Sequence, residues 1–226
     1  MKTGSDALTQ ASEKLIVCDT PLILHNLSIL RDKNTTPEMF RTAIKRISQI
    51  LINKAFENLP LITKKVETPL ITTGTKVIDE NAELIIAPIL RAGLVFTDAA
   101  LDILPMATVH HIGLYRDETT LKPVPYYNKL PEGFKNPQNT YLYVFDPMLA
   151  TGGSAVAALN LFIERNIPQE NITFVSLLSA PEGVSRLSSE FDRIKIMTCA
   201  VDNCLNDVGY ILPGLGDAGD RIFNTY

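Results

Sequence analysis

One short segment, Tyr141 to Ser154, carries the residues best suited to hold a substrate. An apolar run ends at Asp146, and a loop of small residues then leads into a helix expected from Ala155 to Arg165. Backbone N–H groups at a helix start have no partners within the helix, and the helix dipole favours an anion there. Glycines also let a ligand approach the backbone closely. The segment therefore predicts a phosphate-binding loop, with hydroxyl donors from Thr151 and Ser154.

The position of Asp146 favours a sugar phosphate as the ligand of this loop. It lies at the expected carboxyl end of a strand, where ligands bind on open α/β sheets, and its carboxylate can accept hydrogen bonds from ribose hydroxyls. A nucleoside triphosphate loop is excluded, because no lysine follows Gly153. A match to the dinucleotide-binding pattern, Gly214 to Gly219, lies too close to the C-terminus to be followed by a helix and a second strand.

The segment Asp146-Pro-Met-Leu-Ala-Thr-Gly-Gly-Ser154 resembles the phosphoribosyl pyrophosphate (PRPP) loop of the type I phosphoribosyltransferases, and its Asp-Pro-Met start resembles the uracil branch of that family. The C-terminal segment is the most specific part of the resemblance, because most type I relatives lack it. Further motifs follow in the family's order, from about Asp19 to the C-terminus: Pro88-Ile-Leu-Arg-Ala-Gly93, Gly113-Leu-Tyr-Arg116, Pro123-Val-Pro-Tyr-Tyr127, Ala180-Pro-Glu-Gly183 and Tyr210-Ile-Leu-Pro-Gly-Leu-Gly-Asp-Ala-Gly-Asp-Arg-Ile-Phe223.

The resemblance implies an enzyme of pyrimidine salvage that transfers the phosphoribosyl group of PRPP to N1 of uracil and releases UMP and pyrophosphate. It implies an α/β fold in which a central, mostly parallel sheet is flanked by helices, with N-terminal helices, a long β-arm or lid loop and a C-terminal hood over the base. Relatives are homodimers or homotetramers, and some respond to GTP or CTP. Two rival functions are a type I enzyme for a purine or orotate, which should lack the Gly214 to Gly219 pocket, and an RNA-binding regulator.

Arg91, Arg116, Asp146 and Asp217 are the candidate catalytic residues. The two arginines follow expected strands, where they suit the pyrophosphate anion; the alternatives are a surface ion pair for Arg91 and a salt bridge to adjacent acids for Arg116. Asp217 could accept the N1 proton or stabilise the ribose, and both roles stay open. The resemblance assigns PRPP contacts to these four residues and to Pro147, Met148, Leu149, Ala150, Thr151, Gly152, Gly153 and Ser154, and uracil contacts to the backbone of Ile211, Gly216, Asp217 and Ala218.

The expected cofactor is Mg²⁺, but the sequence offers it no obvious ligand set. Many type I relatives carry two adjacent acids at the start of the PRPP loop, whereas here Pro147 follows Asp146. Mg²⁺ dehydrates reluctantly, so we expect PRPP oxygens and water to hold it. The chain also ends in Phe223-Asn-Thr-Tyr226 where the family usually has Phe-Gly-Thr-Lys; Asn224 can replace glycine in a left-handed turn.

Composition indicates one globular domain over all 226 residues, 46% of which are hydrophobic. The net charge of −4 favours neither nucleic acid nor a membrane surface as a partner, and it weighs against an RNA-binding regulator. Cys18, Cys199 and Cys204 fit no zinc pattern and are expected to be reduced, partly buried thiols. The N-terminus has no apolar signal core and no apolar run reaches spanning length, so we expect a cytoplasmic protein.

Hydrophobic spacing predicts alternating strands and helices, which is typical of a parallel sheet with helical crossovers. Residues 1–12 are expected to be frayed, 116–139 to form an arm or lid with a dimer contact as the rival role, and 202–226 to form the hood. The histidines are attributed to helix and strand packing. Expected helices cover Pro21 to Leu30, Pro37 to about Asn58, Leu94 to Leu104, Ala155 to Arg165 and Glu182 to Phe191; expected strands cover Glu83 to Ile89, Ala107 to Leu114, Tyr141 to Phe145, Thr173 to Leu178 and Ile194 to Ala200, and Lys64 to Ile78 is expected as two short strands broken at Thr73-Gly74.

Overall fold

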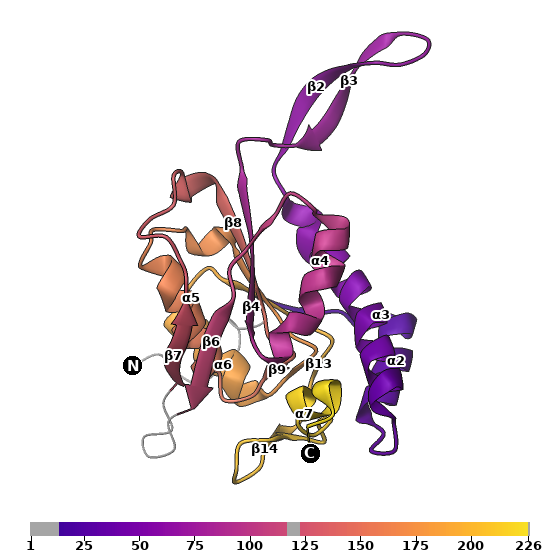
Figure 1. Cartoon of the computed structure of the whole chain (residues 1–226), viewed down its shortest axis with the longest axis vertical. Helices are drawn as coiled ribbons and strands as arrows, with labels where there is room; N and C mark the ends of the chain where they lie inside the picture. The colour runs from indigo at the N-terminus through magenta and orange to yellow at the C-terminus, as the bar shows by residue number, and fades with distance from the viewer. Residues whose placement is uncertain (1–13, 117–122, 226) are drawn as a thin grey trace.

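The computed structural model describes residues 14–116 and 123–225. Its centre is a sheet with the strand order β1-β12-β10-β8-β4-β6-β7, in which β5 also pairs with β4 (Figure 1). All of these pairings are parallel except that of β6 with β7, so the predicted α/β class with a mostly parallel sheet is confirmed. The strands are β1 (Leu15–Val17), β4 (Glu83–Leu90), β5 (Thr108–Val109), β6 (Ile112–Arg116), β7 (Pro123–Asn128), β8 (Thr140–Phe145), β10 (Ile172–Val175) and β12 (Lys195–Thr198).

Helices cover both faces of the sheet. On one face lie α2 (Pro21–Arg31), α3 (Pro37–Ala55) and α4 (Thr97–Ile103); on the other lie α5 (Gly153–Ile163) and α6 (Pro181–Glu190) (Figure 1). A hydrophobic core lies on each side of the sheet, and alternate side chains of β4 pack into the two cores. Leu84 and Ile86 pack into one core, and Ile85 and Ala87 pack into the other. This double burial explains why β4 reads as a continuous apolar run.

Local signals set most of the element boundaries. The Thr36 side chain caps α3 by accepting a hydrogen bond from the Met39 N–H at 3.3 Å, and Pro37 occupies the first helical position, as predicted. The helix expected from Leu94 begins as a 3₁₀ turn (Ala92–Phe96) ahead of α4, and shorter 3₁₀ turns cover Phe56–Asn58, Pro137–Asn139 and Gln169–Asn171. In the part of the chain that the structure describes, no helix combines the length and apolar character needed to cross a bilayer.

A β-hairpin of β2 (Leu61–Glu67) and β3 (Thr72–Ile78) projects from the end of the molecule opposite α7 (Ala218–Phe223) (Figure 1). The predicted break at Thr73-Gly74 is wrong, because Gly74 pairs with Lys65 within the ladder. The chain instead turns at Thr68, whose N–H donates to Ile71 O and whose hydroxyl accepts from Ile71 N–H. Sequence analysis foresaw two strands here but not a projecting arm.

The arm or lid expected over 116–139 is only partly described. Its β7 pairs antiparallel with β6 at the edge of the main sheet, and residues 117–122 lie outside the described chain, so a lid role stays a prediction. The single strand expected over 107–114 is divided at His110 and His111, since β5 pairs with the middle of β4 and β6 with its end.

A second, small parallel sheet forms just beyond the carboxyl ends of the central strands. It contains β9 (Met148–Leu149), β11 (Leu178–Ser179) and β13 (Ala200–Val201). The strands expected to run through 178 and 200 are thus each interrupted before entering this sheet. The expected hood follows as the antiparallel pair β14 (Cys204–Leu205) and β15 (Ile211–Leu212) and then α7.

Candidate active site

The predicted phosphate loop lies between β9 and the first turn of α5. Gly152 caps the helix with φ of +76°, a conformation that other residues adopt at a cost. A Cβ there would lie 3.2 Å from the Leu187 side chain and 3.3 Å from Gly183 O, so space is also tight. The Thr151 hydroxyl accepts from Gly153 N–H at 3.5 Å, and Ser154 is exposed. The strand, loop and helix start therefore have the order that the sequence predicted.

Asp146 directly follows β8, and its carboxylate has few partners. The Met148 N–H donates to Oδ1 at 3.3 Å, and no other hydrogen bond to the carboxylate forms within the described chain. Burial raises the pKa of the Asp146 carboxyl to about 7, which the Met148 N–H only partly opposes. The backbone is well fixed, because Asp146 N–H donates to Val175 O and Pro147 O accepts from two N–H groups. Asp146 is thus a rigidly placed acceptor that lacks donors.

A cavity of about 260 Å³ joins the phosphate-loop side to the C-terminal segment. The phosphate-loop side contributes Asp146, Met148 and Ala150, and the C-terminal segment contributes the four predicted uracil-contact residues. Thr151 to Ser154 continue the same loop outside this lining. The cavity is lined by Ala92, Asp146, Met148, Ala150, Gly209, Tyr210, Ile211, Gly216, Asp217, Ala218 and Gly219. Residues more than 50 positions apart in the sequence, predicted to bind two parts of one substrate pair, therefore meet in one hollow.

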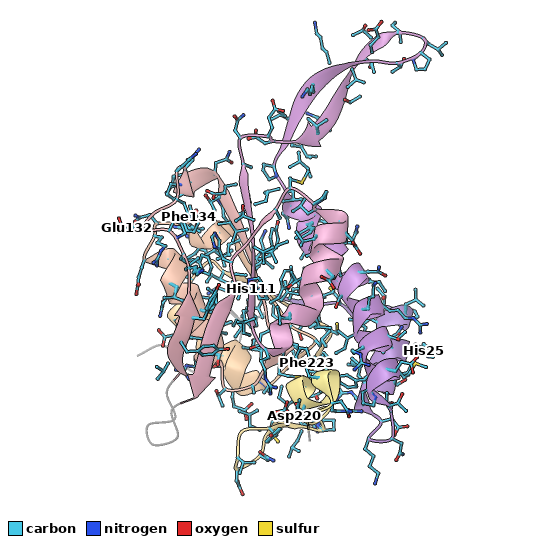
Figure 2. The ribbon with its side chains drawn as sticks, in the orientation of Figure 1. His25, His111, Glu132, Phe134, Asp220 and Phe223 are labelled. Atoms are coloured by element: carbon cyan, nitrogen blue, oxygen red, sulfur yellow. The ribbon has the colours of Figure 1, made fainter. Side chains whose placement is uncertain are left out.

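Arg91 lies next to this cavity, in the loop after β4. Close packing holds the loop there: a Cβ on Gly93 would lie 2.4 Å from Phe145 O, so only glycine fits against the end of β8. The Arg91 side chain is 59% exposed and forms an ion pair with Asp220 at 3.4 Å. Its guanidinium also lies 6.0 Å from the centre of the Phe223 ring, and Figure 2 shows Asp220 and Phe223 together at α7. The ion pair foreseen as the alternative role does form, but its exposure makes it weak.

The other two candidate catalytic residues differ in what the structure describes. Arg116 ends the backbone of β6 at the same edge, but its side chain lies outside the described part. Asp217 caps α7: its Oδ1 accepts from Asp220 N–H at 2.9 Å. Sequence analysis missed this capping, although an aspartate just before a short helix is its usual signal. One carboxylate oxygen of Asp217 therefore already has a structural partner.

The predicted uracil segment turns sharply at two glycines beside the cavity. Gly214 and Gly216 have φ of +63° and +80°, and a Cβ on Gly214 would lie 2.1 Å from Ile211 O. Neither the N–H nor the C=O of Gly216 has a hydrogen-bond partner among the described residues. Asn224 closes α7 in the left-handed conformation (φ 56°), as predicted for the position where relatives have glycine.

Comparison with known proteins assigns the family. The family model described as "Uracil phosphoribosyltransferase" matches residues 17–225. A protein of that name from Dictyoglomus thermophilum is 52% identical over 211 residues, which cover 93% of this chain and 99% of the relative. Another from Lactococcus lactis subsp. cremoris is 47% identical and covers 94% of this chain and 99% of its own length. The chain belongs to the uracil phosphoribosyltransferase family.

Solved structures show the fold of the chain. The AQ2163 protein from Aquifex aeolicus aligns with a TM-score of 0.83 and 35% identity, covering 93% of this chain and 98% of that one. Adenine phosphoribosyltransferase from Trypanosoma brucei aligns with a TM-score of 0.52 at 11% identity, covering 86% and 89%, which shows a shared fold. The predicted type I phosphoribosyltransferase fold is confirmed.

The structure also shows the surroundings of residues that lie outside the family's motifs. His110 and His111 are half-buried where β5 gives way to β6, and burial lowers the pKa of His110. His25 is exposed on α2, on the outer side of the molecule in Figure 2, so its expected packing role is wrong. Cys18 and Cys199 are buried and free, and Cys204 is exposed and free. The sequence also contains no signal for Arg31, Asp202 and Arg221, whose hydrogen bonds join α2 to the C-terminal segment across more than 170 positions.

Proposed function

We propose that this chain transfers the phosphoribosyl group of PRPP to N1 of uracil, giving UMP and pyrophosphate, as a step of pyrimidine salvage. One observation carries the proposal: a single cavity is lined by Asp146, Met148 and Ala150 of the phosphate-loop side and by the glycine-rich C-terminal segment on the other. The first surface suits a ribose phosphate, and the second suits a flat base read by backbone groups.

In this reaction the C1–O bond of PRPP breaks with its electron pair on pyrophosphate, and the N1–C1 bond forms as N1 loses a proton. Positive charge develops on the ribose and negative charge on the leaving group, so fixed, oppositely charged groups accelerate the step. We assign pyrophosphate binding to Arg91 and Arg116. The exposed pair of Arg91 with Asp220 is weak enough to exchange for the leaving group.

We assign the 5′-phosphate to residues 147–154, in particular to the N–H groups in the first turn of α5, which have no partners within the helix. Asp146 accepts from the ribose hydroxyls, which would supply the donors that its half-buried carboxylate lacks. The second oxygen of Asp217 faces either the N1 proton or the developing charge on the ribose; both roles fit a carboxylate in the cavity wall.

Uracil recognition is assigned to the backbone of Ile211 and of Gly216 to Ala218. Uracil presents an acceptor at O4 and a donor at N3, whereas cytosine presents the reverse at both positions. A fixed backbone pattern that satisfies uracil therefore faces like groups on cytosine, and unmade hydrogen bonds of this kind discriminate by about 10⁴-fold.

We propose Mg²⁺ as the cofactor, bound mainly through PRPP and water. Among the described residues, no cluster of three His, Cys, Asp or Glu side chains could hold a metal ion, and Pro147 follows Asp146. This donor set fits an ion that keeps most of its own waters. When bound, Mg²⁺ would supply positive charge to the departing pyrophosphate.

A homodimer or homotetramer, a GTP or CTP effector, a cytoplasmic location and a lid over 116–139 stay predictions. The β2–β3 hairpin supports the assembly: Leu70 and Ile71 near its tip are 95% and 70% exposed, which is costly for a monomer in water. Sedimentation velocity would test this prediction directly.

Turnover tests the main proposal. The protein is incubated with PRPP and uracil, cytosine, orotate, hypoxanthine or adenine, with Mg²⁺ or with EDTA, and the nucleotides are separated by chromatography. We expect UMP from uracil only, and only with the cation. Nucleotide formed from a purine or orotate in place of uracil, or UMP formed equally in EDTA, would contradict the proposal.

A further inference from the structure

One ion pair holds the loop that the cavity uses to present its backbone. The Arg31 guanidinium, at the end of α2, contacts Asp202 through both terminal nitrogens, at 2.8 Å and 2.5 Å. The same pair grips Gly214 from two sides: Arg31 Nη1 donates to Gly214 O at 2.8 Å, and Asp202 Oδ2 accepts from Gly214 N–H at 2.9 Å. Asp202 is buried, with 5% of its side chain exposed, and Arg31 has 27% exposed.

A second arginine holds the next peptide of the loop. Arg221, buried on α7, donates to Leu215 O at 2.7 Å, and also to Leu30 O and to Asp32 O, the last at 2.6 Å. Its guanidinium lies 4.3 Å from the centre of the Phe40 ring. Arg221 therefore fastens the loop to the end of α2, close to Arg31.

These contacts fix a run of consecutive peptide units. The bond to Gly214 N–H fixes the peptide between Pro213 and Gly214, the bond to Gly214 O fixes the one that follows, and the bond to Leu215 O fixes the one that ends at Gly216. The next peptide, from Gly216 to Asp217, is the first whose groups have no such anchor, and both residues line the cavity. The clamp thus stops where the backbone faces the cavity.

We propose that Arg31 and Asp202 are positioning residues for the base: they touch neither substrate, but they set the direction of the backbone groups at Gly216 to Ala218 that read uracil. This inference rests on the proposed function. A buried ion pair is often no more stabilising than apolar residues of similar volume. Its particular contribution here is geometric, because one planar guanidinium and one carboxylate hold both polar groups of a glycine at positive φ.

The decisive variant is Arg31→Lys. An ammonium keeps the charge opposite Asp202, but a single nitrogen cannot reproduce the fork that bonds both carboxylate oxygens and Gly214 O. We expect KM for uracil to rise by about tenfold or more, and the preference for uracil over cytosine to fall, because small displacements of positioning groups have effects of this size. KM for PRPP should stay within about threefold of wild type, since the PRPP loop is untouched.

Asp202→Asn is the companion variant, because it can still accept one hydrogen bond and should show a smaller shift in the same direction. Arg193→Lys is the control: Arg193 forms an exposed ion pair with Glu170 at 3.3 Å, away from the cavity lining. Circular dichroism and thermal unfolding confirm that each variant is folded. Hydrogen exchange at the Gly214 amide, which donates to Asp202, should become faster in Arg31→Lys than in Arg193→Lys.

The results of these measurements distinguish failure of the proposed activity from failure of the positioning role of Arg31 and Asp202. A wild-type protein that makes no UMP refutes the proposed function and this inference with it. An active wild type with unchanged uracil KM and unchanged base preference in folded Arg31→Lys refutes positioning alone. Equal increases in KM for uracil and PRPP would also refute it, since they would show general loosening. A rise in KM that is confined to uracil, together with faster hydrogen exchange at the Gly214 amide, supports the positioning role.

Discussion

Replacement of Asp146 by asparagine should stabilise the fold at alkaline pH while weakening PRPP binding. The carboxyl has an ordinary pKa of 3.8 and a pKa of about 7 in the folded protein, and burial is the main cause of the rise. The folded state therefore binds the proton more tightly than the unfolded chain does. The stability that this proton contributes is complete below about pH 4 and is lost progressively as the pH rises to about 7.

The size of the effect follows from this shift. Between pH 5 and pH 8 the wild-type protein should lose about 2.5 kcal/mol of its free energy of unfolding from this group. Asparagine has nearly the same shape, does not titrate and can still accept from Met148 N–H. The free energy of unfolding of Asp146→Asn minus that of wild type should therefore increase by about 2.5 kcal/mol over this range.

Urea denaturation of both proteins at pH 5, 6, 7 and 8 measures this difference, with Asp192→Asn as a control at an exposed aspartate. A difference that is the same at every pH would show that the Asp146 carboxyl is not held neutral by burial. Calorimetry at pH 8 then tests the functional side. The amide lacks the charge that strengthens bonds from ribose hydroxyls, so PRPP affinity should fall by roughly 1.5–3 kcal/mol. Unchanged affinity would assign Asp146 a structural role only.

Other predictions concern the rest of the cavity. Arg91→Ala should lower kcat/KM by a factor equivalent to about 2–4 kcal/mol of lost transition-state stabilisation, whereas Asp79→Ala should leave kcat/KM near wild type. Steady-state kinetics that find both variants near wild type would remove Arg91 from the site. Gly216→Val should abolish the preference for uracil over cytosine, because a β-branched residue at φ of +80° is strained, while Leu215→Met should keep it; competition assays with both bases decide this. Gly93→Ala should destabilise the protein by several degrees in Tm, because its Cβ would meet Phe145 O, and a calorimetric scan with unchanged Tm would contradict this close packing.

The sequence predicted local features such as helix starts well, because each depends on neighbouring residues, whereas the substrate contacts assigned to the site stay predictions. Gly152 marks a helix start and Thr36 a cap, and both signals lie within a few positions of the feature they define. The turn at Thr68 was misplaced because Gly74 was taken as a breaker, yet an exposed hairpin tolerates glycine within its ladder. The division of the strand at His110 depends on its register with β4, which no local pattern contains.

Long-range polar contacts were beyond sequence analysis for a related reason. Arg31 lies 171 positions from Asp202 and 183 from Gly214, and its partners include a backbone oxygen, which every residue possesses. Asp217 was noticed as a possible reactive group, whereas its capping bond to Asp220 N–H depends on where α7 begins. Motifs therefore identified the groups that face the cavity and missed those that hold them in place.

That distinction has a physical basis in how the charged groups are partnered. Asp202 accepts three hydrogen bonds and Arg221 donates to three backbone oxygens, so both are satisfied without a ligand. Asp146, in contrast, is half-buried in the cavity wall with one long hydrogen bond, and Arg91 has one weak, exposed ion pair. An acceptor that is partly desolvated and has few donors destabilises the fold, and it is retained where a ligand supplies the missing donors. The same reasoning supports the proposals that substrate binds at Asp146 and Arg91 and that Arg31, Asp202 and Arg221 hold the backbone in place. It also implies that PRPP should raise the Tm of wild-type protein more than that of Asp146→Asn, because only the wild-type carboxylate gains its charge-assisted bonds on binding.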